Sequence, residues 1–305
     1  MFRSRQGSIW LFRFAGIDVY LHWMWFVMAV FQVQRRTGYS SLAWSVAEYL
    51  SLFVIVLLHE FGHALACRSV GGQANQIVLW LLGGVAYVAP PQRPGAVLWS
   101  LAAGPLVNVL LAPLLVGLWV LSGTWGWQET APDLYRLILH IMAINLVLLC
   151  FNLLPIYPLD GGQILRALLW FPLGQARSLV IATVIGFVGL IGFVVLTFAL
   201  RSPWYALMCA FIFINCGKGL LEGLALLRMA KAPRREGFAC PACHAPPPRG
   251  SFWTCSKCRK PFDIFETLGF CPNCGVEYSA TRCFECGEMA PMSFWMGGPV
   301  PPVVK

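Results

Sequence analysis

Two histidines and a glutamate stand inside an otherwise apolar stretch, Val54 to Ala66 (VIVLLHEFGHALA). His59 and His63 are four residues apart, so on a helix they lie on one face, about one turn from each other. Both imidazoles can then reach one metal ion, and Glu60 stands beside them, placed to take a proton from a metal-bound water. The pattern His-Glu-x-x-His therefore predicts metal-dependent hydrolysis.

The alternative to a metal site is a purely structural role, in which the two histidines form hydrogen bonds across a helical bundle. The surroundings disfavour it, because a charged carboxylate in the hydrocarbon region costs about 2.5–3.5 kcal/mol on insertion scales. Such residues are rare in spans and usually functional.

The composition is that of a membrane protein. Of the 305 residues, 58% are hydrophobic and 11% are charged, whereas a soluble domain carries about 25% charged residues. The mean hydropathy is +0.68. The net charge of +9 mainly reports topology and contact with anionic lipid, so it does not indicate nucleic-acid binding.

Apolar runs predict a mainly α, polytopic membrane protein with about six transmembrane helices, since about 20 residues are needed for each crossing. The predicted spans are residues 17–33, 42–70, 96–121, 135–154, 178–200 and 204–224. Residues 76–89 are too short for a helical span and are broken by Gly83-Gly84. They predict a short membrane-associated β segment near the metal.

Six spans would put both termini on one side of the membrane. The positive-inside bias assigns that side to the cytoplasm, because most basic loop residues fall there: Arg68, Arg93, Arg166, Arg177, Arg228, Lys231, Arg234 and Arg235. The opposite side holds Glu129 and Asp133. The exceptions are Arg35, Arg36 and Arg201. We expect a multi-pass cell-membrane protein with both termini and the active site on the cytoplasmic side.

The third metal ligand is expected to be Asp160. Catalytic zinc usually takes three protein ligands and keeps a fourth position for water. Asp160 follows two prolines and precedes two glycines, so it sits in a broken helix at the cytoplasmic end of a span. Non-helical backbone at membrane depth is tolerated only inside protein or beside a wet cavity. The alternative is that Asp160 merely caps the helix that starts near Gln163.

Three segments together resemble the site-2 protease family of intramembrane zinc metalloproteases. They are His59–His63 (HEFGH), Gly104–Asn108 (GPLVN) and Asn152–Gly162 (NLLPIYPLDGG). The resemblance covers roughly residues 15–225, and the Gly83-Gly84 stretch is similar to the family's membrane-associated β segment.

The resemblance implies that His59, His63 and Asp160 bind a catalytic zinc ion and that Glu60 is the general base. The implied function is hydrolysis of peptide bonds in or near transmembrane segments of membrane-anchored substrates, as in regulated intramembrane proteolysis. A helical substrate must first unwind locally, and the Gly83-Gly84 region is a candidate to hold it as an added strand.

The resemblance also assigns two asparagines. It implies that Asn108 and Asn152 orient the substrate or stabilise the oxyanion. His22 and His140 match no family motif and are expected to be interfacial or packing residues.

Eight of the twelve cysteines form four Cys-x-x-Cys pairs in the last quarter of the chain: Cys240, Cys243, Cys255, Cys258, Cys271, Cys274, Cys283 and Cys286. Eight thiolates suit two structural zinc sites in a reducing compartment. The simplest pairing joins the first pair with the second and the third with the fourth, and a cross-braced pairing stays open. Cys67, Cys150, Cys209 and Cys216 lie in apolar runs and are expected to be small core residues.

These features predict five parts of the chain: a basic interfacial N-terminus at 1–14, a transmembrane metalloprotease core at 15–226, a linker at 227–237, a double zinc-ribbon domain at 238–290 and a disordered tail at 291–305. The expected cofactors are one catalytic and two structural zinc ions. The expected partners are a transmembrane protein substrate, the lipid bilayer and a protein that docks on the ribbons. Nucleic acid is not expected, because the ribbons are tethered to a membrane enzyme.

Two rival interpretations remain. In one, the chain is a catalytically silent membrane scaffold that acts through its zinc ribbons; an intact Glu60 favours the enzyme, because a structural site needs no base. In the other, it is a metal transporter, which is weaker because the polar residues lie at one depth and form no path across the bilayer.

Overall fold

The computed structural model describes residues 7–34, 38–80, 83–201 and 203–296. Its contacts divide the chain into two compact units. The first comprises residues 1–174 and 178–219, and the second comprises residues 175–177 and 220–305.

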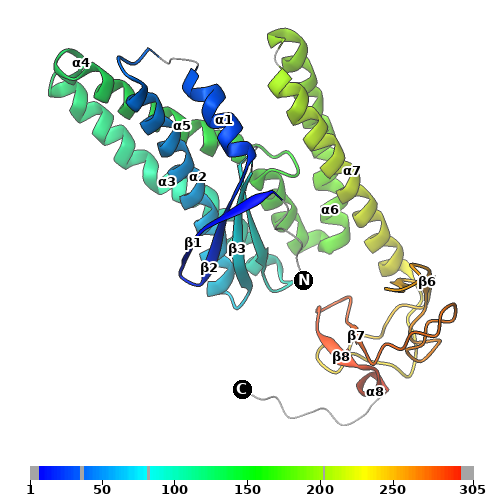
Figure 1. The fold of residues 1–305 in the computed structure, drawn as a ribbon. Coiled ribbons are helices and arrows are strands. Elements are labelled where there is room, and N and C mark those ends of the chain that lie inside the picture. Colours follow the sequence, from blue (N-terminus) through cyan, green and yellow to red (C-terminus); the bar gives the residue numbers. More distant parts are fainter. Residues whose placement is uncertain (1–6, 35–37, 81–82, 202, 297–305) are drawn as a thin grey trace. The chain divides into compact units, whose positions relative to one another are not determined.

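Long helices dominate the fold (Figure 1). Within the described residues, five are long and apolar enough to cross a membrane: α2 (Leu42–Ser69), α3 (Pro94–Thr124), α5 (Pro132–Asn152), α6 (Asp160–Leu200) and α7 (Pro203–Lys231). They confirm the spans predicted after residue 40, with boundaries that move by a few residues. The exception is α6, where Gly174 has non-helical backbone (φ 78°, ψ 165°) and separates the helix that begins at Asp160 from the predicted span at 178–200.

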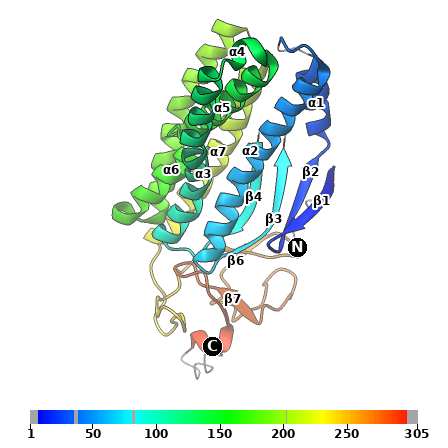
Figure 2. The same cartoon turned by 90° about the vertical axis from the view of Figure 1, so that its left-hand side faces the viewer.

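The predicted β segment is confirmed and is part of a larger sheet. Its strands are β1 (Ser8–Phe14), β2 (Ile17–His22), β3 (Gln73–Trp80) and β4 (Gly83–Ala89). They lie in the order β1-β2-β3-β4, with β2 and β3 parallel and the other two pairs antiparallel. Figure 2 shows α2 running beside β3 and β4.

The prediction of one helical span over residues 17–33 is wrong. Residues 17–22 form β2, and the helix that follows, α1 (Met24–Gln34), has 11 residues. At 1.5 Å per residue it is about 16 Å long, short of the roughly 30 Å hydrocarbon core. Ile17, Val19 and Leu21 alternate with Asp18, Tyr20 and His22, and the first three lie in the core. This period of two is typical of a strand, and the apolar run that follows it made the whole stretch read as one helix.

Strand β2 and helix α1 nevertheless follow α2 in the opposite direction. Near the end of α2, the guanidinium of Arg68 donates to the carbonyls of Ala15 and Gly16. Near its beginning, the hydroxyl of Tyr49 donates to the carbonyl of Trp25 at 2.6 Å. The chain around β2 and the start of α1 therefore runs antiparallel to α2, first as a strand and then as a helix.

The core of the first unit lies between α2 and the sheet. It contains Ile17, Val19, Leu21, Trp25, Val56, Phe61, Ala64, Cys67, Ala74, Ile77 and Leu79. On the other side, α2 packs closely on α3, because a Cβ at Gly62 would stand 2.6 Å from the carbonyl oxygen of Ala103. Small residues allow such close approach between membrane helices. This packing holds the histidines of α2 rigidly between the sheet and α3.

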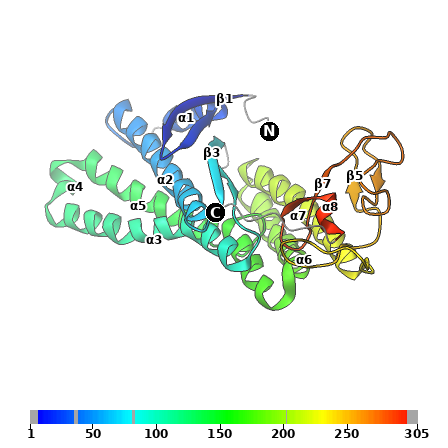
Figure 3. The same cartoon turned by 90° about the horizontal axis from the view of Figure 1, so that it is seen from below.

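The second unit contains two short hairpins, β5 (Trp253–Thr254) with β6 (Pro261–Phe262) and β7 (Ala280–Arg282) with β8 (Met289–Pro291). Helix α8 (Met292–Trp295) follows β8 directly and lies beside this hairpin (Figure 3). Trp295 is 2% exposed, so the tail predicted as disordered from residue 291 is packed at least through α8. Residues 297–305 lie outside the described part of the chain.

Candidate metal centre

Three predicted ligands meet at one point. His59 and His63 come from α2, and Asp160 is the first residue of α6. Asp160 Oδ2 lies 2.9 Å from His59 Nε2 and 3.3 Å from His63 Nε2, and the two Nε2 atoms are 3.1 Å apart. Both histidines are buried, at 3% and 7% exposure.

The donor set fits a zinc ion. Tetrahedral zinc with bonds of about 2.0–2.1 Å places its ligand atoms about 3.3 Å from each other. The Nδ1 atom of His63 faces the carbonyl oxygen of Ser100 at 2.8 Å, and that of His59 faces Asn108 Oδ1 at 2.7 Å. Both Nδ1 atoms must therefore carry the hydrogen. The two bare Nε2 atoms then face a carboxylate oxygen, and three converging acceptors without a hydrogen between them call for a cation.

Glu60 lies beside the three ligands and outside the group that can share the metal. It is 6% exposed, and its Oε2 accepts the backbone N–H of Ala86 in β4 at 2.8 Å. Gly84 makes this approach possible, since a Cβ there would stand 2.2 Å from Glu60 Cγ. The sheet therefore positions the candidate base.

The two predicted asparagines occupy different places. Asn152 Nδ2 lies 3.4 Å from His59 Nε2, on the side of the ligand atoms, where it can donate to an oxygen near the metal. Asn108 has no exposed surface and uses its amide on His59 and on Asn145. These contacts indicate that Asn108 orients His59 and does not contact a substrate.

Sequence reasoning missed Ser100 and Asn145. Ser100 contributes a backbone carbonyl, which no residue type signals. Asn145 carries a usable signal: it is an amide in an apolar span, seven residues and two helical turns before Asn152.

The two histidines that match no family motif, His22 and His140, have other partners. His22, at the end of β2, stacks near Trp80 with ring centroids 4.9 Å apart. His140, in α5, bonds Glu48 Oε2 at 2.8 Å and the hydroxyl of Tyr39 at 3.1 Å.

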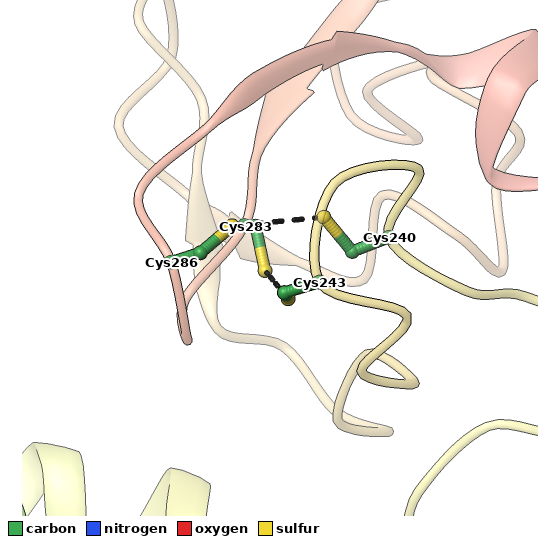
Figure 4. Close-up of side chains that lie close together, drawn as sticks. All are labelled: Cys240, Cys243, Cys283 and Cys286. Carbon is green, nitrogen blue, oxygen red and sulfur yellow. Dashed lines mark hydrogen bonds between the residues drawn. The ribbon is translucent and has the colours of Figure 1, made fainter. Parts of the chain in front are cut away.

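The cysteine pairs of the second unit form two groups. The first pair meets the fourth (Cys240, Cys243, Cys283, Cys286), and the second meets the third (Cys255, Cys258, Cys271, Cys274). Figure 4 shows the first group. Its Sγ atoms approach to 3.7 Å, and those of the second group to 3.4 and 3.7 Å. A Cys₄ zinc site with Zn–S bonds of about 2.3 Å has sulfur atoms about 3.8 Å apart.

The sequential pairing predicted as the simplest is therefore wrong, and the arrangement is not cross-braced. It is nested: the second and third pairs form one group, and the first and fourth pairs form the other. One pair of each group lies in a hairpin turn, Cys255 and Cys258 between β5 and β6, and Cys283 and Cys286 between β7 and β8. The sequence could not distinguish these arrangements, because all four pairs have the same spacing.

Each cysteine pair is held by the same turn. The residue after the second cysteine has a left-handed backbone at all four places: His244, Arg259, Gly275 and Gly287. Its N–H donates to the carbonyl of the first cysteine. Backbone N–H groups also point at the sulfur atoms. The N–H of Cys258 and the hydroxyl of Tyr278 lower the pKa of Cys255 to about 5, which favours the thiolate that binds metal.

The nested pairing predicts a metal count. Changing Cys240 and Cys286 together to serine is expected to remove one zinc ion per chain, because both residues belong to one group. Changing Cys240 and Cys271 together is expected to remove two. Elemental analysis of the purified full chain measures the counts, and the opposite order of losses would contradict the nesting.

The fold and the centre define a class: a polytopic membrane protein whose helices hold a buried His₂Asp metal site with a glutamate beside it. Residues 47–131 and 126–196 match the model of Peptidase family M50. The chain belongs to this family.

Known proteins are similar over about half to two thirds of this chain. Zinc metalloprotease MJ0392 of Methanocaldococcus jannaschii is 32% identical over 210 residues, covering 69% of this chain and 59% of that protein. Putative zinc metalloprotease sll0528 of Synechocystis is 29% identical, covering 60% of this chain and 48% of that protein. Stage IV sporulation protein FB of Bacillus subtilis is 31% identical over 150 residues, 47% of this chain and 48% of that protein. The chain thus spans about half the length of these relatives.

A solved structure has the same fold. The Site-2 Protease from Methanocaldococcus jannaschii superposes with a TM-score of 0.51 at 28% identity, covering 70% of this chain and 95% of that one.

Proposed function

We propose that this chain is an intramembrane zinc metalloendopeptidase that hydrolyses peptide bonds in or near transmembrane segments of membrane-anchored proteins. The observation that carries the proposal is the convergence of His59, His63 and Asp160 beside Glu60, inside helices apolar enough to span a membrane. Membership of Peptidase family M50 supports it.

The residues divide the chemistry between them. His59, His63 and Asp160 would hold a zinc ion, which when bound would act as a Lewis acid and lower the pKa of water towards about 7. Glu60 takes the proton from the attacking water and passes it to the leaving amine. Asn152 donates to the oxygen of the scissile carbonyl as negative charge develops there.

The sheet suggests how the substrate is held. In the described residues, β4 lies at the edge of the sheet, and the N–H of Ala86 points away from β3 towards Glu60. An unwound substrate segment that pairs with this edge comes to lie beside the base. Such strand addition uses main-chain hydrogen bonds and tolerates varied side chains.

Reconstitution tests the proposal. The full chain in lipid vesicles is expected to cut a membrane-anchored test protein, to stop when a chelator removes zinc and to resume when zinc is returned. In cells, a membrane-anchored protein is expected to accumulate uncut when Asp160→Asn replaces the wild-type chain at matched expression. If no fragment differs under any growth condition, while removal of residues 238–296 gives a phenotype, the scaffold interpretation replaces this one.

We also propose that both termini and the active site lie on the cytoplasmic side. Five helical spans alone would separate the ends of the chain, but β2 with α1 follows α2 in reverse and supplies the sixth crossing. The basic residues Arg68 and Arg93 flank the loop between α2 and α3 that contains β4. A fluorescent protein fused after Lys305 is expected to fluoresce, and a periplasmic reporter enzyme fused there is expected to stay inactive. An active reporter enzyme would reverse the orientation.

The second unit is proposed to recruit a substrate or a partner protein through a double zinc-ribbon domain, residues 238–296. The two Cys₄ groups support the metal-dependent fold. Removing it is expected to leave cleavage of a short test protein intact and to slow cleavage of the native substrate.

A further inference from the structure

Two buried amides lie behind the metal centre. Asn108 in α3 and Asn145 in α5 have no exposed surface. Asn108 Nδ2 donates to Asn145 Oδ1 at 2.8 Å, and Asn145 Nδ2 donates to the backbone carbonyl of Asn108 at 3.0 Å. The mechanism above gives Asn145 no part.

These contacts fix the orientation of both amides. A backbone carbonyl can only accept, so the nitrogen of Asn145 must face it and the oxygen of Asn145 must face Asn108. Asn108 therefore turns its nitrogen towards Asn145 and its oxygen towards His59 Nδ1, at 2.7 Å. An oxygen at that place requires the hydrogen of His59 to be on Nδ1 and leaves Nε2 free to bind metal.

Helix α5 thus acts on both nitrogens of one imidazole. Asn145 acts on His59 Nδ1 through Asn108. Two turns further along the same helix, Asn152 lies 3.4 Å from His59 Nε2. The ring of His63 is held differently, because its Nδ1 faces the backbone carbonyl of Ser100. A backbone carbonyl cannot exchange its acceptor for a donor as a side-chain amide does when it flips.

We propose that Asn145 is a positioning residue for the zinc centre: through Asn108 it sets the tautomer of His59. Without Asn145, the amide of Asn108 is free to turn its nitrogen to His59 Nδ1. That arrangement favours the tautomer with hydrogen on Nε2, which cannot bind zinc. The inference rests on the proposed role of His59 as a zinc ligand.

A purely structural role is the alternative, since buried amides also join membrane helices. The two roles differ in what they change. An amide that only joins α3 and α5 affects stability. An amide that sets the tautomer of His59 affects zinc affinity, and only while Asn108 is present.

The test measures zinc affinity of the full chain by competition with a chelator, with the His63→Ala variant identifying the signal of this centre. Asn145→Leu removes the hydrogen bonds at similar size and is expected to weaken zinc binding about 10- to 100-fold, the usual effect of losing a partner behind a ligand. Asn108→Ala is expected to do the same. The double variant is expected to bind zinc no more weakly than either single variant. All three variants lose the same chain of hydrogen bonds from Asn145 through Asn108 to His59.

Two further variants serve as controls. Asn145→Asp, protonated in its apolar surroundings, can still donate to the carbonyl of Asn108 and accept from its amide, so affinity within about threefold of wild type is expected. Asn215→Leu removes an amide of α7 that donates to Phe211 in its own helix at 2.8 Å, and is expected to change nothing at the centre. If Asn145→Leu does not fold, Asn145→Asp and Asn108→Ala still test the route.

The inference is overturned if Asn145→Leu binds zinc within twofold of wild type, or if the losses of the two single variants multiply in the double variant. It is also overturned if Asn145→Asp loses as much affinity as Asn145→Leu. These outcomes are independent of proteolysis: a chain that binds zinc as expected and cuts no protein would overturn the proposed function alone.

Discussion

Glu60→Gln is expected to abolish peptide hydrolysis and to leave the zinc content unchanged. Glu60 is not one of the three residues that can share the metal. Glutamine has the same shape, and its amide oxygen can still accept the N–H of Ala86 that holds Glu60 now. It cannot take a proton from water, and losing a general base costs about 10²- to 10⁴-fold in rate. Cleavage of a reconstituted membrane-anchored test protein and elemental analysis measure the two effects.

A matched acid serves as control. Glu129 lies exposed in α4 (Trp127–Thr130), and Glu129→Gln is expected to alter neither rate nor zinc content. Retained hydrolysis in Glu60→Gln would exclude Glu60 as the base. Loss of zinc in that variant would instead make it a ligand.

Gly104→Ala is expected to abolish zinc binding at the His59, His63 and Asp160 centre. Gly104 faces α2 from α3, and a Cβ there would stand 2.2 Å from His63 Nε2, the atom proposed to bind zinc. The imidazole must then move or turn, and this takes its Nε2 from its present place 3.1 Å from His59 Nε2 and 3.3 Å from Asp160 Oδ2. We expect zinc affinity to fall at least 100-fold, as for removal of a ligand, and hydrolysis to fall with it.

The same helix offers the control. Gly117 also lies in α3, and a Cβ there meets nothing within 4 Å. In a helix interior, alanine is more favourable than glycine by roughly 0.5–1 kcal/mol, so neither change should weaken α3 itself. Gly117→Ala should bind zinc like the wild type. Equal zinc binding by both variants would mean that His63 does not occupy this place.

Local pattern was enough to predict the parts of the site that depend on one helix. The spacing of His59 and His63 fixes their common face, and an intramembrane carboxylate beside a helix break singled out Asp160. Helix α5 was predicted with its boundaries nearly right, because a long apolar run has few alternatives.

What could not be predicted depends on contacts between distant segments. Strand β2 was read as part of a helix because an apolar run follows it directly, and its pairing with β1 and β3 depends on residues elsewhere in the chain. The role of Asn108 changes once Asn145, 37 residues away, is seen to face it. The nested pairing of the cysteine pairs depends on the tertiary fold of the second unit. It could not be predicted from the sequence because all four pairs have the same Cys-x-x-Cys spacing.

That nesting sets an order of events during synthesis and degradation. The outer group joins residues 46 positions apart, Cys240 and Cys286, so it cannot close until nearly the whole second unit has left the ribosome. The last cysteine of the inner group is Cys274, so all four of its members leave the ribosome before Cys283 and Cys286. A protease that unfolds the chain from its C-terminal end reaches Cys286 and Cys283 before Cys274 and Cys271, so a metal ion held by the outer group would have to be released before force reaches the inner group.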